Sequence, residues 1–181
     1  MRFPALLVVA GFVLTACDAA PTTPNTLPLQ ASRTSGQLTA ARAATQRFAD
    51  FDKAFKTGYQ TIFLNACFSD PTAGAMGYHY VNGALLDGTV DATAPEAVMY
   101  EPQADGSLTM VGLEYVVDAG QWDASKGAPT LFGETYAFNP AFNIYTLHVW
   151  LHRANPTGMF QPWNPAVSCA NAPTTLKEHA H

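Results

Sequence analysis

Three residues of this chain carry side chains that commonly ligate metal ions and lie within runs of β-forming residues: His79, Glu114 and His148. Apolar or aromatic residues flank each of them, and a charged glutamate is costly to bury alone in such surroundings. Neutral imidazoles and a carboxylate from neighbouring strands can converge on one ion and leave open positions for water or a ligand. The three residues are therefore a candidate site for a divalent transition metal, namely zinc, copper or iron.

Two other interpretations of the same residues stay open. In the first, His79 and His148 are hydrogen-bonded core residues and Glu114 pairs with one of them, because no HExxH, CxxC or HxH element supports a metal site. In the second, the site is a small-molecule pocket without metal. Aromatic residues that could line such a pocket, although at strand spacing they more often belong to the core, are Tyr78, Tyr80, Tyr100, Tyr115, Trp150 and Trp163.

The segment Asn143–Arg153 decides how its two histidines can act. Its residues, NIYTLHVWLHR, are strand formers, and Asn-Pro turn signals stand on both sides of it. In a strand, His148 and His152 are about 13 Å apart and cannot share an ion, whereas in a helix they would be one turn apart. We favour the strand, so any site at His148 must recruit its partners from elsewhere in the chain.

The rest of the chain predicts the elements that would hold these residues. Strands are expected at 76–82, 97–101 and 108–117, and the last two form a hairpin around Asp105-Gly106. A helix is expected from Ser35 to Tyr59, where apolar residues recur every three or four positions at Leu38, Ala41, Ala44, Phe48, Phe51, Phe55 and Tyr59. The predicted fold class is α+β, with a long N-terminal amphipathic helix packed on a mostly antiparallel β-sheet or partly closed barrel.

The distribution of charge excludes one class of partner. Residues 57–176 contain ten acidic side chains and two basic ones, Lys126 and Arg153. Nucleic acids need a basic surface for their phosphates, so we expect no nucleic-acid binding. An acidic surface favours cations but is also a common solution to solubility.

The N-terminus has the features of an export signal. Arg2 precedes a short apolar run from Phe3 to Val13, which Leu14-Thr15-Ala16-Cys17 follows directly. This tetrapeptide resembles the lipobox of bacterial lipoproteins. The resemblance implies cleavage after Ala16, lipidation of Cys17 and attachment of the mature protein to a bacterial membrane, facing the periplasm or the exterior. A plain secretory signal with a chance cysteine is the alternative.

Cysteine usage fits the same compartment. With Cys17 assigned to lipid, Cys67 and Cys169 remain, and two thiols in an exported chain predict one disulfide, although two buried free thiols stay possible. The predicted organisation is a signal peptide at 1–16, a disordered tether rich in Pro, Thr, Ala and Ser at 17–35, a single α+β domain at 36–176 and a loose tail at 177–181.

The body of the chain resembles a family of uncharacterised secreted bacterial proteins over roughly its last two thirds. No activity and no catalytic residues come with this resemblance. Where the resemblance leads us to expect a second tryptophan or similar residue after LHVWL, this chain has His152. That departure makes His152 a weaker functional candidate than His148. The matching pieces are Cys67, 74–82, 95–102, 113–115, 131–133, 147–151 and 155–169.

These observations predict a cell-envelope lipoprotein that binds a ligand or metal ion through His79, Glu114 and His148. One alternative is a metal-dependent hydrolase or oxygenase that uses the same three residues. The other is a structural or interaction lipoprotein, with a protein partner in the envelope and no small-molecule site. The sequence has no GxSxG, Walker or GxGxxG element and no EF-hand loop, so it favours no other class of enzyme or cofactor.

Overall fold

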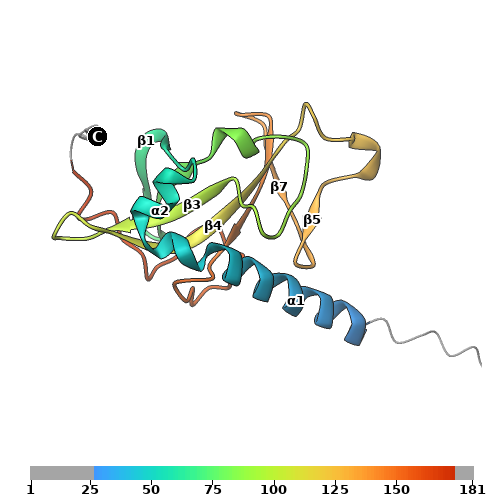
Figure 1. Cartoon of the computed structure of the whole chain (residues 1–181), viewed down its shortest axis with the longest axis horizontal. Coiled ribbons are helices and arrows are strands. Elements are labelled where there is room, and N and C mark those ends of the chain that lie inside the picture. The colour runs from blue at the N-terminus through green and yellow to red at the C-terminus, as the bar shows by residue number, and fades with distance from the viewer. Residues whose placement is uncertain (1–26, 174–181) are drawn as a thin grey trace, which may run out of the picture.

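A computed structural model describes residues 27–173, in which helical segments precede a curled antiparallel sheet (Figure 1). The sheet has six strands in the order β1-β2-β3-β4-β8-β7, and its curl produces a half-barrel. The mixed class and the antiparallel sheet were both predicted. The strands are β1 (Thr61–Asp70), β2 (Gly74–Val81), β3 (Ala97–Pro102), β4 (Leu108–Asp118), β7 (Ala137–Asn139) and β8 (Ile144–Val149), with β5 (Thr130–Leu131) and β6 (Glu134–Thr135) as a separate pair.

The predicted strands in the middle of the chain are confirmed. Strands β3 and β4 pair antiparallel, and the Gly106 φ of 83° supplies the left-handed residue of their turn. The turn is fixed further because the backbone N–H of Ser107 donates to the Asp105 carboxylate over 2.9 Å. Strand β8 is shorter than predicted. It ends at Val149 because the Trp150 N–H donates to the carbonyl of Met159 in a loop and not to a neighbouring strand.

The predicted single helix is wrong in its bounds and continuity. Helix α1 spans Leu27–Thr45, a 3-10 turn η1 follows at Gln46–Ala49, and α2 spans Phe51–Lys56. Two features explain the break: the Thr45 hydroxyl donates to the Ala41 carbonyl, a bond that bends helices, and Asp50 has an extended backbone. Residues 27–35 of the predicted tether are therefore helical.

Only part of the helical region packs on the sheet. The N-terminal turns of α1 are exposed, with Leu29 66% accessible, and in Figure 1 this end of the helix extends beyond the sheet. Burial begins at Ala41 and continues with Phe48 of η1 and Ala54 of α2. The amphipathic character that the sequence predicts for the long helix is thus confined to its C-terminal half and to the two shorter segments after it.

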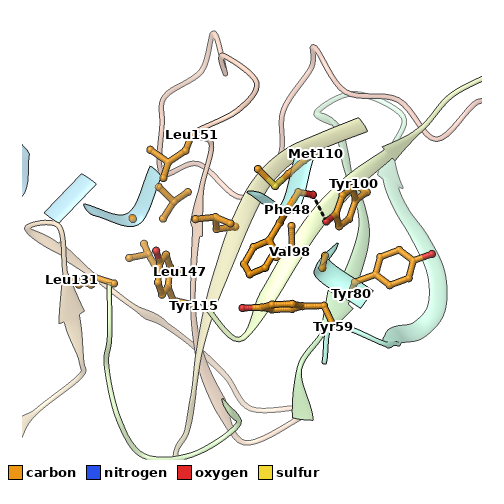
Figure 2. Packing of buried hydrophobic residues seen from close by; sticks show 14 of the residues in the cluster. Phe48, Tyr59, Tyr80, Val98, Tyr100, Met110, Tyr115, Leu131, Leu147 and Leu151 are labelled. Atoms are coloured by element: carbon orange, nitrogen blue, oxygen red, sulfur yellow. Dashed lines mark hydrogen bonds between the residues drawn. The ribbon is translucent and has the colours of Figure 1, made fainter. Parts of the chain in front are cut away.

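One face of the sheet forms the main core together with these helical segments (Figure 2). Alternate residues of β2, β3 and β4 supply large side chains such as Tyr80, Tyr100 and Tyr115, all of them buried. The Tyr100 hydroxyl donates to the carbonyl of Phe48 over 2.7 Å, as the dashed line in Figure 2 marks. Buried tyrosines with a satisfied hydroxyl give both apolar area and a directional tie between sheet and helix.

Strand β1 was not predicted, and its local geometry explains why. Leu64 and Asn65 have left-handed backbones, with φ of 52° and 49°, and the pairing with β2 shifts register between Ile62 and Cys67. A bulge of this kind breaks the two-residue alternation by which a strand is recognised in a sequence. The segment TIFLNACFSD is nevertheless an edge of the sheet.

The predicted disulfide between Cys67 and Cys169 is confirmed, with the two Cα atoms 5.9 Å apart. It connects β1 to the loop that follows β8, and an N–H from Ser168 in this loop also donates to the Glu101 carboxylate. Arg153 donates to the same carboxylate over 2.6 Å. The C-terminal loop is therefore attached covalently and by charged hydrogen bonds to both an edge and the middle of the sheet.

Two further features concern the predicted membrane attachment. Cys17, the signal peptide and the first part of the tether lie outside the residues that the structure describes. Between residues 27 and 173, none of the helices has the length and apolar character needed to cross a membrane. The lipid anchor therefore stays a prediction from the sequence.

Candidate metal centre

The strand register brings the three predicted ligands together on the face of the sheet opposite the main core. Glu114 of β4 pairs directly with His148 of β8, and its other neighbour in the sheet is Ala97 of β3. His79 of β2 pairs with Met99, which lies two residues beyond Ala97 in β3 and therefore on the same face of the sheet. All three side chains offer ligand atoms that lie within 4.8 Å of one another, so the group could hold a metal ion.

His79 and Glu114 come from strands that are not neighbours. Strand β3 lies between β2 and β4, so two inter-strand spacings of about 4.8 Å separate their backbones. The β3 residue that pairs with Glu114, Ala97, is small and fully buried. Gly77, two residues before His79, has a φ of 84°, and a Cβ there would collide with the Tyr100 carbonyl. The left-handed backbone conformation at this position of β2 therefore requires glycine.

The separations between the donor atoms fit a shared ion. The Nε2 atoms of His79 and His148 are 3.3 Å apart. Two donors bound tetrahedrally to zinc at 2.0–2.1 Å would be about 3.3–3.4 Å apart. The Glu114 carboxylate turns one oxygen to each ring, with Oε2 at 3.7 Å from His79 and Oε1 at 3.5 Å from His148. These distances are slightly longer than a tetrahedral edge, and a small shift of the glutamate would close them.

Burial changes the protonation of all three groups. Desolvation, with a contribution from His148, lowers the pKa of His79 to about 3, and desolvation lowers the pKa of His148 to about 4. Desolvation also raises the pKa of Glu114 to about 8. At neutral pH without a cation, both imidazoles are therefore neutral and most of the Glu114 carboxyl is protonated. Neutral imidazoles present the lone pairs that a metal requires, and a bound cation would offset the cost of ionising Glu114.

One atom of this group has an unmet hydrogen-bonding need. In the part of the chain that the structure describes, Nδ1 of His79 is a fully buried nitrogen without a hydrogen-bond partner of good geometry. The Gly77 backbone lies near enough to favour the charged ring and partly opposes the lowered pKa of His79. In metal sites the non-ligating N–H of a histidine usually donates to a carbonyl or carboxylate, and the Gly77 backbone is placed for this role.

A cavity of about 520 Å³ lies on the same side of the sheet. His79, Glu114 and His148 are part of its wall, so the face of the group that points away from the sheet is open to it. Most of the remaining wall is apolar, and it comes from β1, from the strands around β8 and from the loop before the disulfide. Its larger apolar side chains include Phe63, Phe68, Met76, Ile144, Phe160 and Trp163.

The sequence anticipated this cavity only in part. Of the six aromatic residues proposed as pocket walls, Trp163 alone lines it, while the four tyrosines belong to the main core and Trp150 to a second buried cluster. The interpretation that these aromatic residues belong to the core, which their strand spacing favours, therefore holds for five of the six. On β2 and β4 the tyrosines alternate with His79 and Glu114 and face the other way. Phe63 and Phe68 were missed with the bulged strand β1, although their spacing in an apolar run was a signal that could have suggested it.

His152 does not join the group. Its Nε2 lies 3.5 Å from the Thr45 hydroxyl at the end of α1, and desolvation, with Arg42 nearby, lowers its pKa to about 4. The choice of His148 over His152 is thus consistent with the structure.

Comparison of the chain with protein-family models, with curated proteins and with solved structures yields no match.

Proposed function

We propose that the protein is a lipid-anchored metal-binding protein of the bacterial cell envelope, in which His79, Glu114 and His148 hold one divalent transition-metal ion. The observation that carries the proposal is the meeting of these side chains from three strands, with their ligand atoms within 4.8 Å of one another. The lipid anchor rests on Leu14-Thr15-Ala16-Cys17 in the sequence.

The donor set narrows the choice of ion. Two imidazoles and one carboxylate suit zinc, iron or copper, whereas calcium and magnesium prefer oxygen ligands alone. The 3.3 Å separation of the two Nε2 atoms, which also fits a direct hydrogen bond between the rings, is compatible with tetrahedral zinc. Three protein ligands leave a fourth position, which would face the cavity.

An open position in a cavity also supports a second candidate function, a metal-dependent hydrolase or oxygenase with the same ligands. Zinc with two histidines and a glutamate can activate water, and iron with two histidines and a carboxylate can bind oxygen. In either case His79, Glu114 and His148 would hold the ion, and the apolar wall would exclude bulk water. A structural lipoprotein without any small-molecule site is the third candidate, and the first experiment separates it from the other two.

That experiment is elemental analysis of the mature chain, residues 17–181, with Cys17→Ser to prevent acylation and with His179→Ala and His181→Ala to remove stray metal binding by the tail. We expect one equivalent of metal after incubation with zinc, iron or copper. The double variant His79→Ala, His148→Ala should bind none. The matched control is His152→Ala, which removes a desolvated histidine away from the site and should keep the full equivalent. Absence of metal from the folded parent would leave the structural function.

The anchor needs its own test in cells. Full-length protein should incorporate a fatty-acid label and sediment with membranes, and Cys17→Ser should abolish both. Cys67→Ser serves as the control, since it removes a cysteine that the lipobox does not involve. Labelling that persists in Cys17→Ser would contradict the anchor without affecting the metal site.

A further inference from the structure

We propose that the cavity beside His79, Glu114 and His148 binds an uncharged, largely apolar small molecule whose one nitrogen or oxygen donor completes the coordination of the ion. This inference rests on the metal site proposed above and names the class of ligand that the site takes.

The size and lining of the cavity are the first observation that supports an apolar ligand with a single donor atom. Its volume of about 520 Å³ lies within the range of small-molecule sites, about 300–1,000 Å³. Most of the wall is apolar, and the titratable groups in it are concentrated in His79, Glu114 and His148. An apolar space with one polar centre fits a ligand that is apolar except at a single donor atom.

The charges around the cavity are the second observation that supports this inference. Its wall, as far as residues 27–173 form it, contains no lysine or arginine, and Glu114 is its one acidic side chain. Away from the ion, a phosphate or a carboxylate in this space would have no basic side chain to balance its charge. The wall therefore selects against ligands that carry a second, charged group away from their donor atom, and it favours ligands whose remaining part is uncharged.

Exposed apolar residues in the cavity wall are the third observation that supports this inference. Three of its apolar residues are exposed to solvent, Leu64 by 60%, Phe142 by 43% and Leu86 by 41%. They come from the bulge of β1, from the turn between β7 and β8 and from the end of the 3-10 turn η2 (Gly83–Leu85). Exposed apolar side chains in the wall of one cavity are typical of a site where apolar surface is buried on binding.

Backbone strain is present in the segments that contribute these exposed residues. Leu64, Asn65 and Asn143 all have left-handed backbones, with φ between 49° and 54°. Such conformations cost about 1–3 kcal/mol each in residues other than glycine and are found disproportionately at binding sites. Here two of the three segments that contribute exposed apolar residues to the wall are held in them.

The test uses 1-phenylimidazole, an uncharged probe with one ligating nitrogen and an apolar ring, and compares it with imidazole. Both are titrated into the mature chain with Cys17→Ser, His179→Ala and His181→Ala, loaded with Co²⁺, whose visible spectrum reports a new ligand on the ion. We expect 1-phenylimidazole to bind at least tenfold more tightly than imidazole. The anionic analogue 4-(imidazol-1-yl)benzoate should lose most of this gain.

Two variants locate the gain in the cavity. Ile144→Trp fills space in the wall and should reduce the preference for the phenyl group to less than threefold while Co²⁺ still binds. The matched control Leu29→Trp adds the same side chain at an exposed position of α1 and should leave the preference unchanged. Because the parent alone already gives the comparison of the two probes, the test holds even if Ile144→Trp fails to fold.

The outcomes separate the two proposals. A folded parent that binds no Co²⁺ would overturn the metal site. A parent that binds Co²⁺ but takes imidazole and 1-phenylimidazole with equal affinity would overturn the cavity inference alone. Preference for the anionic analogue over 1-phenylimidazole would overturn the assignment of an uncharged ligand.

Discussion

The two faces of the central sheet are built from alternate residues of the same strands, yet they differ in how well their polar groups are satisfied. On the core face the hydroxyls of Tyr59, Tyr100 and Tyr115 each donate to a backbone carbonyl over 2.7 Å. On the cavity face the Nε2 atoms of His79 and His148 are within hydrogen-bond distance of each other, whereas Nδ1 of His79 is, within residues 27–173, a buried nitrogen without a hydrogen-bond partner of good geometry. A buried polar atom left unsatisfied is unusual in a folded protein, and such exceptions to the local rules are typical of functional sites.

The largest expected effect on the free energy of unfolding comes from removing the disulfide on the cavity side of the sheet. The Cys67–Cys169 disulfide has a sequence separation of 102 and joins β1 to the C-terminal loop, both of which supply the cavity wall. On the chain-entropy model such a loop stabilises by about 4–5 kcal/mol. The double variant Cys67→Ala, Cys169→Ala should lower the free energy of unfolding in urea by about that amount.

The disulfide also tests whether the two faces depend on it equally. Hydrogen exchange should show the greater loss of protection in β1 and the C-terminal loop, and a smaller loss in β3 and β4 of the main core. Equal loss throughout would mean that the cavity wall is no less stable than the core. A variant that keeps the unfolding free energy of the parent would contradict the stabilising role.

Adjacent residues of β4 give the sharpest contrast between the faces. Leu113 is fully buried in the main core, so Leu113→Ala should destabilise the protein by about 2–5 kcal/mol while metal binding persists. Glu114→Leu should remove metal binding. It should leave the metal-free protein as stable as the parent, or more stable by about 1–3 kcal/mol, because an apolar side chain replaces a desolvated carboxyl.

Unfolding free energies and metal content, measured on both variants without and with added zinc, would check this pair. Retention of metal by Glu114→Leu would remove the glutamate from the ligand set. A large loss of stability in the metal-free Glu114→Leu protein would mean that Glu114 is a structural partner of the two histidines, which is the interpretation of a hydrogen-bonded core.

A second buried carboxyl, that of Glu96, allows a pH test on a residue outside the proposed ligand set, although Glu114 lies near enough to contribute to its pKa. Glu96 is 4% exposed, and burial raises its pKa to about 8. Its Oε2 accepts a hydrogen bond from the Val116 N–H over 2.7 Å. Between the unfolded pKa of 4.5 and the folded value, the native protein holds a proton that the unfolded chain releases.

Glu96 should therefore stabilise the fold fully below pH 4.5 and progressively less as the pH rises through 8, with a loss of about 1.4 kcal/mol per pH unit between these values. Glu96→Gln, whose amide oxygen can accept the same hydrogen bond, should remove this part of the decline. Urea unfolding of both proteins at several pH values between 4.5 and 9 measures it. Parallel pH curves for parent and variant would show that Glu96 ionises normally.

The sequence predicted the parts of this arrangement that depend on local pattern. Strand formers between turn signals identified β2, β3, β4 and most of β8, and polar residues within them identified the three candidate ligands that the structure brings together. It could not predict that Glu114 pairs with His148, because register depends on contacts between distant segments. Nor could it predict the cavity, since empty space depends on which side chains fail to meet across the curled sheet.

Departures from local pattern account for the remaining errors. The left-handed Leu64 and Asn65 hide β1, and the extended backbone of Asp50 interrupts an apolar periodicity that reads as one helix. The bulge also places an exposed leucine in the wall of the cavity, so the stretch that is hardest to predict lies next to the candidate site.

The smallest expected effect on the free energy of unfolding comes from removing a single hydroxyl from each face of the sheet. Tyr100→Phe leaves the Phe48 carbonyl without its donor in the main core and should cost about 1–2 kcal/mol of unfolding free energy. Thr146→Val removes a hydroxyl of similar kind from the cavity wall, where it is half-buried, and should change stability by less than about 0.5 kcal/mol. If the two substitutions cost the same, polar groups on the cavity face contribute to stability as those of the core do. The contrast between a satisfied and an unsatisfied face would then be confined to His79, Glu114 and His148.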